Sequence, residues 1–447
     1  MKEKKLNSIS PIDGRYRDKV DSISEYFSEK ALIYYRIKVE IEYFLFLCKK
    51  RIGKLKPLNS KESKILRDIY NNFSIKDAIE IKKIEEKTNH DVKAVEYFIK
   101  KKFDKYQLSD YKEFIHFGLT SQDINNTAIP LSIKEFISNI YIPELDKLIT
   151  HLDKIAIKFK DITIISRTHG QPASPTKLGK EILVFSTRIK NQRKSLLKIP
   201  NSAKFAGAVG NFNAHKVAFP KYNWKSFGKE FVESELGLDY SFPTTQIEHY
   251  DSFASLCDNV RRINNILLDL SLDIWTYISL DYFKQKINKN EVGSSAMPHK
   301  VNPIDFENAE GNIGLANSLF DFFSNKLTKS RLQRDLSDST VLRNIGVPFS
   351  HTIISIKSII KGLDKLIVNK IKINADLEQN WIIISEAIQT ILRREGYHNP
   401  YESLKELTRK NTSITKEILH KFIDNLEVSK KIKNELKAIT PSNYTGI

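Results

Sequence analysis

Apolar residues recur at every third or fourth position along several long stretches of this chain. The clearest stripe consists of Leu256, Val260, Ile263, Leu267, Leu270, Ile274 and Ile278. Such spacing places one apolar face along a helix. Because neither glycine nor proline occurs between Pro243 and Gly293, this stretch predicts a helix of about thirty residues or more.

Three further stretches, Glu144–Lys160, Leu178–Leu197 and Ile353–Ile367, show the same spacing. Pro143 stands directly before the first, at a position where proline begins helices. The 447 residues include only 16 glycines and 14 prolines, below the usual share of about 7% and about 5%. So few breakers disfavour a sandwich or barrel of short strands. The sequence therefore predicts an all-α protein built on a bundle of long helices.

Cysteine usage and hydropathy indicate the compartment. Cys48 and Cys257 each lie within an apolar stretch, which predicts buried free thiols in a reducing environment. No run reaches the roughly 18 uncharged apolar residues of a membrane span, and the first residues lack the pattern of a signal peptide. We therefore expect a soluble, cytoplasmic protein.

The chain is strongly basic, with 72 Lys and Arg against 54 Asp and Glu, a net charge of +18. A nucleic-acid-binding surface would cluster its basic residues. Here only 16 of the 72 are arginines, and the lysines are scattered along the whole chain. The pattern disfavours a nucleic-acid function and favours a positive field that attracts small anionic substrates.

Segments rich in polar and small residues separate the apolar stripes, and packing does not require them. They span residues 10–20, 88–91, 116–126, 166–175, 207–215, 293–308 and 331–344. Loops on a rigid scaffold are where binding and catalytic residues concentrate. We therefore expect these segments to be loops that carry the chemistry.

The densest of these segments reads GSSAMPHKVNP over residues 293–303. Its hydroxyls, backbone donors and Lys300 could wrap a carboxylate, and the ammonium could stabilise a serine alkoxide. A capped helix start would explain Ser294 and Ser295 but not Lys300 and Asn302. The segment is therefore a candidate anion-binding or catalytic loop.

Histidine and arginine mark other candidate groups. His169 lies beside Arg167 in the segment SRTHGQP, and imidazole is the natural proton donor near neutral pH; a structural role is the alternative. Arg15, Arg334 and Arg343 lie in polar segments. Guanidinium groups bind phosphate or carboxylate through two donors, and surface ion pairs are the alternative. Neither a phosphate-loop motif nor metal-ligand spacing of His and Cys occurs.

Together these motifs resemble the fumarase/aspartase/argininosuccinate lyase superfamily and, within it, the adenylosuccinate lyase family. The matching motifs are SPIDGRY at 10–16, TNHDVKAVE at 88–96, SRTHGQPA at 166–173, GAVGN at 207–211, MPHKVNPIDFEN at 297–308 and QRDLSDSTVLR at 333–343. The resemblance extends from about residue 8 to the C-terminus. Several ordered motifs are far more specific than any one of them.

The resemblance implies an all-α protein of three domains, which we place at residues 1–111, 112–364 and 365–447. It implies that the central long helices assemble into a homotetramer whose active sites are shared between chains. The expected reaction eliminates fumarate from adenylosuccinate to give AMP, and from the succinyl-carboxamide intermediate of purine synthesis (SAICAR) to give AICAR. No metal or organic cofactor is implied.

The resemblance also assigns residue roles. Ser294 is expected to act as the general base and His169 as the general acid that protonates the departing nitrogen. Expected substrate contacts are Arg15, Tyr16, Asn89, His90, Asp91, Thr120, Ser121, Gln246, Ser295, Lys300, Asn302, Asn308, Arg334, Ser339, Thr340, Val341, Leu342 and Arg343. The nucleotide part would be held by Arg15, Tyr16, Arg334 and the 339–343 segment, and the succinyl part by Thr120, Ser121, Lys300 and Asn302. The segment IEHYD at 247–251 departs from the family's usual order, so His249 and Tyr250 receive no role.

Two alternatives remain at this point. The first is a sister lyase that acts on argininosuccinate or aspartate, or that hydrates fumarate. His299 and the arginines at 334 and 343 favour a nucleotide substrate over these. The second is a non-enzymatic protein that keeps the lyase fold for structure or for binding RNA. The presence of Ser294, His169 and Lys300 disfavours it.

Overall fold

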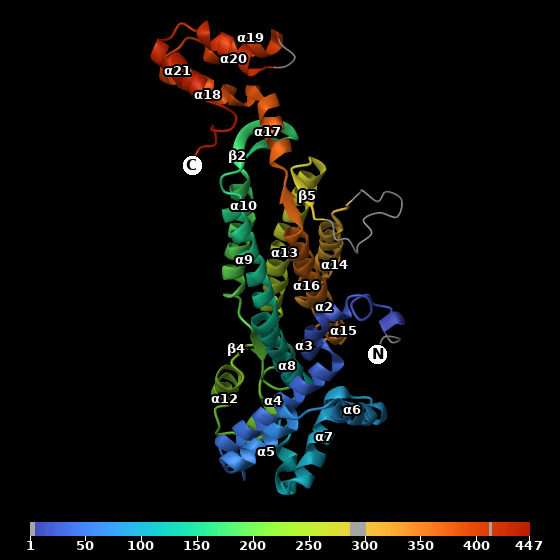
Figure 1. Ribbon diagram of the computed structural model, residues 1–447. Helices are drawn as coiled ribbons and strands as arrows, with labels where there is room; N and C mark the ends of the chain where they lie inside the picture. The colour runs from blue at the N-terminus through green and yellow to red at the C-terminus, as the bar shows by residue number, and fades with distance from the viewer. Residues whose placement is uncertain (1–4, 287–300, 411–413) are drawn as a thin grey trace. The chain divides into compact units, whose positions relative to one another are not determined.

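The computed structural model describes residues 5–286, 301–410 and 414–447. Helices form most of the structure, and the strands within these ranges make three short pairs (Figure 1). The predicted all-α class is confirmed. None of the helices in the described ranges is both long enough and apolar enough to cross a bilayer.

The chain divides into two compact units. Unit 1 comprises Met1–Leu145, Gln192–Asn265 and Gly311–Lys357, and unit 2 comprises Asp146–Asn191, Ile266–Glu310 and Ser358–Ile447. Five long helices contribute residues to both units: α9 (Ile142–Lys158), α10 (Leu178–Leu196), α13 (Asp251–Ser279), α14 (Ile304–Leu327) and α16 (Gly346–Asp364). The division into three domains stays a prediction.

Unit 1 also contains shorter elements from all three of its stretches of the chain. Its helices are α2 (Arg17–Val20), η1 (Asp21–Ile23), α3 (Ser24–Phe27), α4 (Glu29–Lys49), α5 (Ser60–Asn71), α6 (Ile75–Thr88), α7 (Asp91–Lys105), η2 (Ser109–Phe114), α8 (Ser121–Phe136), η3 (Ile137–Tyr141), α11 (Asn213–Ala218), α12 (Trp224–Glu230), η4 (Phe231–Glu235) and α15 (Ser337–Leu342). Its strands β3 (Ser202–Lys204) and β4 (Asp239–Ser241) pair in parallel.

Helix α4 forms the centre of the unit 1 core. It is buried along almost its whole length, because α5, α7, α8 and η4 all pack against it. Aromatic rings tie it to the 205–231 segment: Tyr43 and Phe46 lie with their centroids between 4.7 and 6.2 Å from those of Phe205, Phe227 and Phe231. This rigid core supports the N-terminal ends of α7 and α8, which carry predicted site residues.

A two-stranded antiparallel hairpin stands out in unit 2. Strands β1 (Thr163–Thr168) and β2 (Gln171–Lys177) pair with Thr168 opposite Gln171, so His169 and Gly170 form the turn. Both turn residues have positive φ, 53° and 75°, as the type I′ turn of a two-residue hairpin requires. The hairpin therefore holds His169 at its tip.

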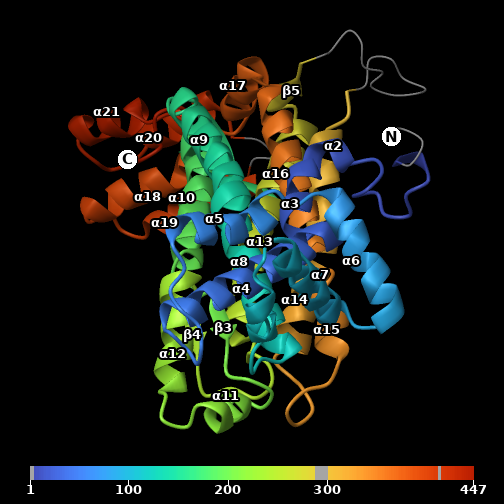
Figure 2. The ribbon, with the colours of Figure 1, turned by 90° about the horizontal axis from the view of Figure 1, so that it is seen from below.

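The other elements of unit 2 are short. They are β5 (Phe283–Gln285), β6 (Leu366–Val368), α17 (Lys370–Gln379), η5 (Trp381–Ile384), α18 (Ser385–Arg394), α19 (Pro400–Lys410), α20 (Lys416–Asp424) and α21 (Lys430–Ala438). Strands β5 and β6 pair antiparallel. Helices α18–α21 gather into one cluster in both views (Figures 1 and 2). Helix α17 contacts β1, and η5 contacts β2, so the C-terminal segment supports the hairpin.

The apolar stripes predicted from the sequence form helices. Leu256, Val260, Ile263, Leu267, Leu270 and Ile274 are buried on α13, which has 29 residues, and Ile278 is half-buried. Both cysteines are buried and free, as predicted, and burial raises the pKa of Cys48 to about 12.

Two predicted helix boundaries are wrong. Pro143 does not begin a helix, because α8, the π-helical turn η3 and α9 follow one another without interruption. A π-helical turn shifts the hydrogen-bond pattern, and the missing N–H of proline is tolerated beside it. The second wrong boundary is the end of the helix predicted over Ile353–Ile367. Helix α16 ends at Asp364, and Ile367 lies in strand β6, where its carbonyl and N–H pair across the sheet instead of along a helix.

Several segments expected to be loops are partly regular structure. Residues 121–126 form the first turns of α8, residues 304–308 begin α14, residues 337–342 form α15, and residues 166–175 belong largely to the β1–β2 hairpin. The polar residues of the helical segments sit at helix ends, where their side chains satisfy free backbone groups. The predicted chemistry-bearing groups are therefore mostly mounted on element termini.

Candidate functional site

The proposed general acid occupies the exposed tip of the hairpin in unit 2. His169 and its neighbours Arg167 and Gly170 are exposed, and the Arg167 guanidinium donates to the Gly170 carbonyl at 3.4 Å. At the base of the hairpin, the Ser174 hydroxyl donates to Glu386 of α18 at 2.5 Å. The imidazole is therefore held on a rigid turn and is accessible to a ligand.

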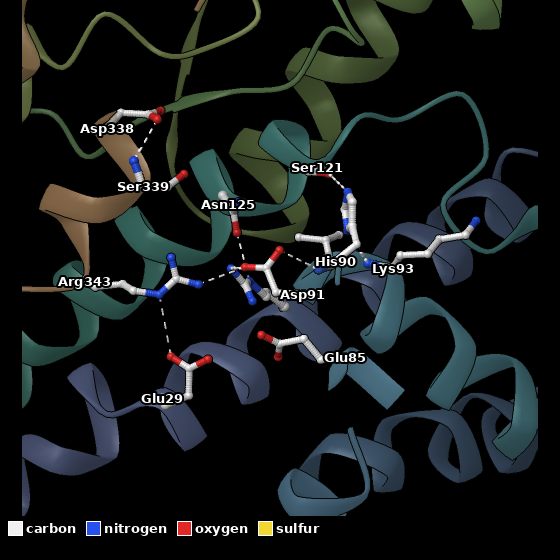
Figure 3. Close-up of polar contacts among 12 residues, drawn as sticks. Glu29, Glu85, His90, Asp91, Lys93, Ser121, Asn125, Asp338, Ser339 and Arg343 are labelled. Atoms are coloured by element: carbon white, nitrogen blue, oxygen red, sulfur yellow. Dashed lines mark hydrogen bonds and ion pairs between the residues drawn. The ribbon is translucent and has the colours of Figure 1, made fainter. Parts of the chain in front are cut away.

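The N-terminus of α7 in unit 1 presents three predicted contacts. Asn89 ends α6 in the left-handed conformation, with φ 49°. His90 caps α7, because its Nδ1 accepts from the Lys93 N–H at 3.0 Å. A neutral ring with an accepting Nδ1 carries its proton on Nε2. That nitrogen lies 3.4 Å from the Ser121 hydroxyl oxygen at the start of α8 (Figure 3).

Asp91 lies between two arginines (Figure 3). Its Oδ2 accepts from Arg36 Nη2 at 2.7 Å and from Arg343 Nη2 at 3.0 Å. The Arg36 side chain is 3% exposed and also donates to Asn125 at 2.9 Å. Burial opposes ionisation of Asp91, but the charge and hydrogen bond of Arg36 outweigh it and lower the pKa of Asp91 to about 2. Asp91 is therefore a carboxylate that orients Arg343.

The α15 segment brings the second predicted arginine into the same region. The Arg334 guanidinium donates to the Ser339 hydroxyl at 2.7 Å and to Asp338 at 3.2 Å. The Gln122 amide oxygen accepts from Arg334 at 2.6 Å in the orientation that satisfies both groups. Arg334 and Ser339 are half-buried, so their polar groups remain partly open to a ligand.

The other residues of this segment differ in what they can contribute. Val341 and Leu342 are 9% and 6% exposed, so their side chains belong to the core, and only their backbone could contact a substrate. Thr340 is exposed. Arg343 has a side chain that is 42% exposed and lies 3.9 Å from Glu29.

Two cavities adjoin Arg343. One, of about 70 Å³, is lined by Glu29, Arg36, Gln122, Asn125 and Ser339 among others. The other, of about 240 Å³, is lined by the 10–13 segment and by residues around Gly346. Arg343 lines both. A guanidinium at the wall of a cavity is suited to bind an anionic group of a ligand.

The remaining predicted residues of unit 1 come from three segments of the chain. Thr120 caps α8 in a reciprocal capping box with Asp123. The Gln246 amide donates to the Ala208 carbonyl at 3.0 Å. Arg15 is exposed and Tyr16 precedes α2. Neither lines the two cavities beside Arg343.

Tyr250 and His249, to which the sequence assigned no role, have clear contacts. Tyr250 is buried, accepts from the Asn126 amide at 2.7 Å and donates to Asp338 at 3.4 Å. His249 Nε2 donates to the Pro243 carbonyl at 2.9 Å. Tyr250 thereby supports Asp338, which in turn accepts from Arg334.

Unit 2 holds the other predicted contacts. Asn302 is half-buried, and the Asn308 side chain on α14 accepts from the Ser358 hydroxyl at 2.9 Å. Ser294, Ser295 and Lys300 lie outside the described residues. Within the described ranges, no cluster of three or more His, Cys, Asp or Glu side chains forms a ligand set for a metal ion.

Sequence reasoning missed the buried charges that support these residues. Arg36 lies on the buried helix α4, and Asp123 and Lys204 are fully buried. Lys204 stands alone among the small and apolar residues of SAKFAGAV, and this lone charge was the available signal, because such a residue must find a partner. The partner itself, often 80 or more residues away, cannot be identified from one sequence.

Comparisons with known proteins identify the family of the chain. A profile of the lyase family matches residues 14–316, and a profile of the adenylosuccinate lyase C-terminal family matches residues 330–445. Relatives named adenylosuccinate lyase include one from Dictyostelium discoideum, 58% identical, and one from Legionella pneumophila (strain Corby), 51% identical. Each alignment covers 99% of this chain and 97% of the relative.

The fold is also shared with distant relatives. The crystal structure of a fumarate lyase from Mesorhizobium sp. BNC1 aligns with a TM-score of 0.74 at 17% identity, over 95% of each chain. At this identity the match shows the fold alone. The chain belongs to the lyase family and, within it, to the adenylosuccinate lyases.

Proposed function

We propose that this chain eliminates fumarate from adenylosuccinate to give AMP, and from SAICAR to give AICAR. The observation that carries the proposal is identity of up to 58% over nearly the whole chain with relatives named for this activity. The presence of His169 and of the Arg334–Arg343 segment at the matching motifs supports it. A positive net charge of +18 also favours anionic substrates.

Arg334, Ser339 and Arg343 hold the anionic part of the nucleotide in this proposal. The positions of these three side chains support this assignment. Arg343 lines two cavities, and Arg334 and Ser339 are hydrogen-bonded to each other at 2.7 Å. Two guanidiniums with a hydroxyl form a suitable clamp for phosphate. Asp91 acts in this account by orienting Arg343, with which it shares a 3.0 Å ion pair.

The chemical step is a general acid–base elimination. Ser294, which lies outside the described residues, takes the proton from the carbon next to a succinyl carboxylate. The electron pair of that C–H bond forms the double bond of fumarate as the C–N bond breaks. His169 donates a proton to the departing nitrogen. The exposed hairpin turn that carries His169 is suited to enter a site built from other segments.

The chain acts as a homotetramer with shared sites in this proposal. Large apolar side chains are exposed along the long helices, including Leu183, Val184, Leu272, Trp275, Leu315 and Phe322, each between 43% and 55% exposed. Exposed apolar side chains on long helices support an interface between chains if they lie on shared faces. Helix faces that pack against other copies of the chain would bury these side chains.

A panel of substrates tests the reaction class and the substrate together. The purified chain is incubated in turn with adenylosuccinate, SAICAR, argininosuccinate, aspartate and fumarate, without added metal. We expect turnover with the first two alone. Turnover of argininosuccinate or aspartate, or hydration of fumarate, would assign a sister activity instead. Salt-sensitive RNA binding without turnover of any substrate would support the non-enzymatic alternative.

A further inference from the structure

An ion pair with no solvent exposure lies directly behind two of the predicted succinyl contacts. Lys204 Nζ donates to Asp123 Oδ1 at 2.7 Å, and both side chains are 0% exposed. Removing two charges from water is costly, and well-packed apolar residues often stabilise a fold as much or more. Stability alone therefore gives little reason for a charged pair at this place.

The carboxylate of Asp123 binds backbone amides from two distant segments. Its Oδ2 accepts from the Thr120 N–H at 2.8 Å, at the beginning of α8. Its Oδ1 accepts from the N–H groups of Ala206 and Gly207 at 2.9 and 3.0 Å, in addition to Lys204. One side chain thus fixes the first turn of α8 against the segment that follows β3.

Lys204 adds a second connection to Gly207. Its Nζ also donates to the Gly207 carbonyl at 2.6 Å, so the pair holds both the N–H and the C=O of Gly207. This glycine has φ of +78°, a conformation that favours glycine. The ammonium and the carboxylate therefore set the direction in which the 207–210 loop leaves β3.

The 207–210 loop in turn contacts a third segment, residues 244–246. The Ala208 carbonyl accepts from the Gln246 amide at 3.0 Å. A Cβ added at Gly210 would lie 1.9 Å from the Thr244 carbonyl oxygen, so the loop passes in direct contact with 244–246. One buried ion pair is thus connected to three residues that are expected to contact the substrate: Thr120, Ser121 and Gln246.

We propose that Asp123 and Lys204 are positioning residues for the succinyl half of the substrate site. They hold Thr120 and Ser121 in a fixed relation to the Gly207–Gly210 loop and, through Ala208, to Gln246. Which ligand the site takes rests on the proposed function. The anchoring of the three segments rests on the hydrogen bonds alone.

The arrangement requires a carboxylate at position 123. Two backbone N–H groups and an ammonium converge on Oδ1, and a third N–H reaches Oδ2. An asparagine has one acceptor oxygen, and its NH₂ would face a donor. A neutral pair such as Asp123→Asn with Lys204→Met therefore preserves the volume and removes both charges, but it loses part of the anchoring.

The test compares this double variant with the wild type as full-length enzymes. Misplacing groups by about 1 Å costs on the order of 100-fold in rate, so we expect kcat/KM for adenylosuccinate to fall about 10- to 100-fold. Product inhibition separates the two halves of the site. We expect the inhibition constant of fumarate to rise about 10-fold while that of AMP stays unchanged.

A matched control lies in the same unit. Glu42 is a carboxylate whose side chain is 11% exposed, and it accepts from the Arg67 guanidinium twice at 2.8 Å and from the Tyr70 hydroxyl at 2.7 Å. None of these residues is a predicted substrate contact. Glu42→Gln is expected to lower the melting temperature without changing either inhibition constant.

Amide hydrogen exchange measures the anchoring without reference to any ligand. We expect peptides covering 117–123 and 205–211 to lose protection in the double variant and to keep it in Glu42→Gln. Lys204→Arg keeps the positive charge, so its inhibition constant for fumarate should be close to that of the wild type. If the double variant does not fold, Asp123→Asn alone is measured in the same way.

Several results would overturn the proposal. Unchanged protection of both peptides would do so, as would unchanged fumarate inhibition or an equal loss of fumarate and AMP inhibition. A wild type without lyase activity would instead remove the proposed function, and hydrogen exchange would then decide whether the pair anchors these segments.

Discussion

Single carboxylates set the direction of the arginines that face the proposed nucleotide site. Asp91 joins the buried Arg36 to the partly exposed Arg343, and Asp338 accepts from Arg334. The resemblance placed Asp91 and Arg343 together as substrate contacts. In the structure the Asp91 Oδ2 accepts from both guanidiniums, so we propose that Asp91 orients Arg343, and its contact with the substrate stays a prediction.

Asp91→Asn tests this assignment. Because Arg36 lowers the pKa of Asp91 to about 2 from 3.8, the carboxylate contributes about 2 kcal/mol to the free energy of unfolding. A lowered pKa means that this contribution is present above pH 3.8 and is lost as the pH falls toward 2. We expect the variant to be less stable by about that amount at pH 7 and to approach the wild type near pH 2.

Urea unfolding at several pH values measures this difference, and the KM for adenylosuccinate should rise because Arg343 loses its partner. Asp110→Asn, an exposed carboxylate of the same unit, is the control that should change neither quantity. Equal stability of Asp91→Asn and wild type at pH 7 would show that the ion pair contributes nothing.

His169→Ala tests the general acid. Removing a positioned proton donor costs about 100- to 10,000-fold in rate, so kcat should fall by at least about 100-fold while AMP still binds. His398 is another exposed histidine of unit 2, and His398→Ala should leave kcat unchanged. A normal rate in His169→Ala would assign the proton transfer to another group.

The sequence predicts the interiors of the long helices well and the ends of the helices and strands poorly. The apolar stripes predicted the long helices correctly, because burial repeats with the helical period along α13. The β1–β2 hairpin was not predicted, since its exposed tip is polar and its strands have only six and seven residues. The sequence predicts loops for the TSQD and TNHD segments because capping residues are polar, although these segments lead into α8 and α7.

The segment that leads into α8 carries a pH-dependent anchor. His116 has φ of 58°, and its Nδ1 lies 2.6 Å from the fully buried Glu40. Burial opposes the charged imidazole, but the Glu40 carboxylate outweighs it and raises the pKa of His116. A raised pKa means that the pair stabilises the fold fully below the unfolded value of 6.5 and loses this contribution as the pH rises through the folded value.

Glu40→Gln should therefore destabilise the protein more at pH 6 than at pH 9, by about 1–3 kcal/mol at the lower pH. Urea unfolding at both pH values measures the difference. Glu42→Gln lies on the same helix, and its partner Arg67 does not titrate in this range, so its effect should be the same at both. A Glu40→Gln effect that does not depend on pH would exclude a charged His116.

At the scale of the whole molecule, the proposed acid and base and the arginine cluster lie in different parts of the chain. His169 belongs to unit 2, and Asp91, Arg334 and Arg343 belong to unit 1. No single-sequence pattern shows whether one site draws these groups from one chain or from several. The exposed apolar side chains of the long helices support assembly from several chains.

Mixing two inactive variants tests shared sites. If the sites combine groups from different chains, a mixture of His169→Ala and Ser294→Ala should regain activity after subunit exchange, because some sites then contain both native groups. Light scattering should give four times the mass of one chain. Mixed tetramers detected by mass but without activity would show that both groups act from one chain.

The product balance with adenylosuccinate tests the proposed reaction directly. The purified chain is incubated with this substrate without added metal, and fumarate and AMP are quantified by chromatography over time. We expect both to appear in equal amounts, at a rate proportional to the enzyme concentration. A folded tetramer that releases neither product, or AMP without fumarate, would contradict the proposed reaction.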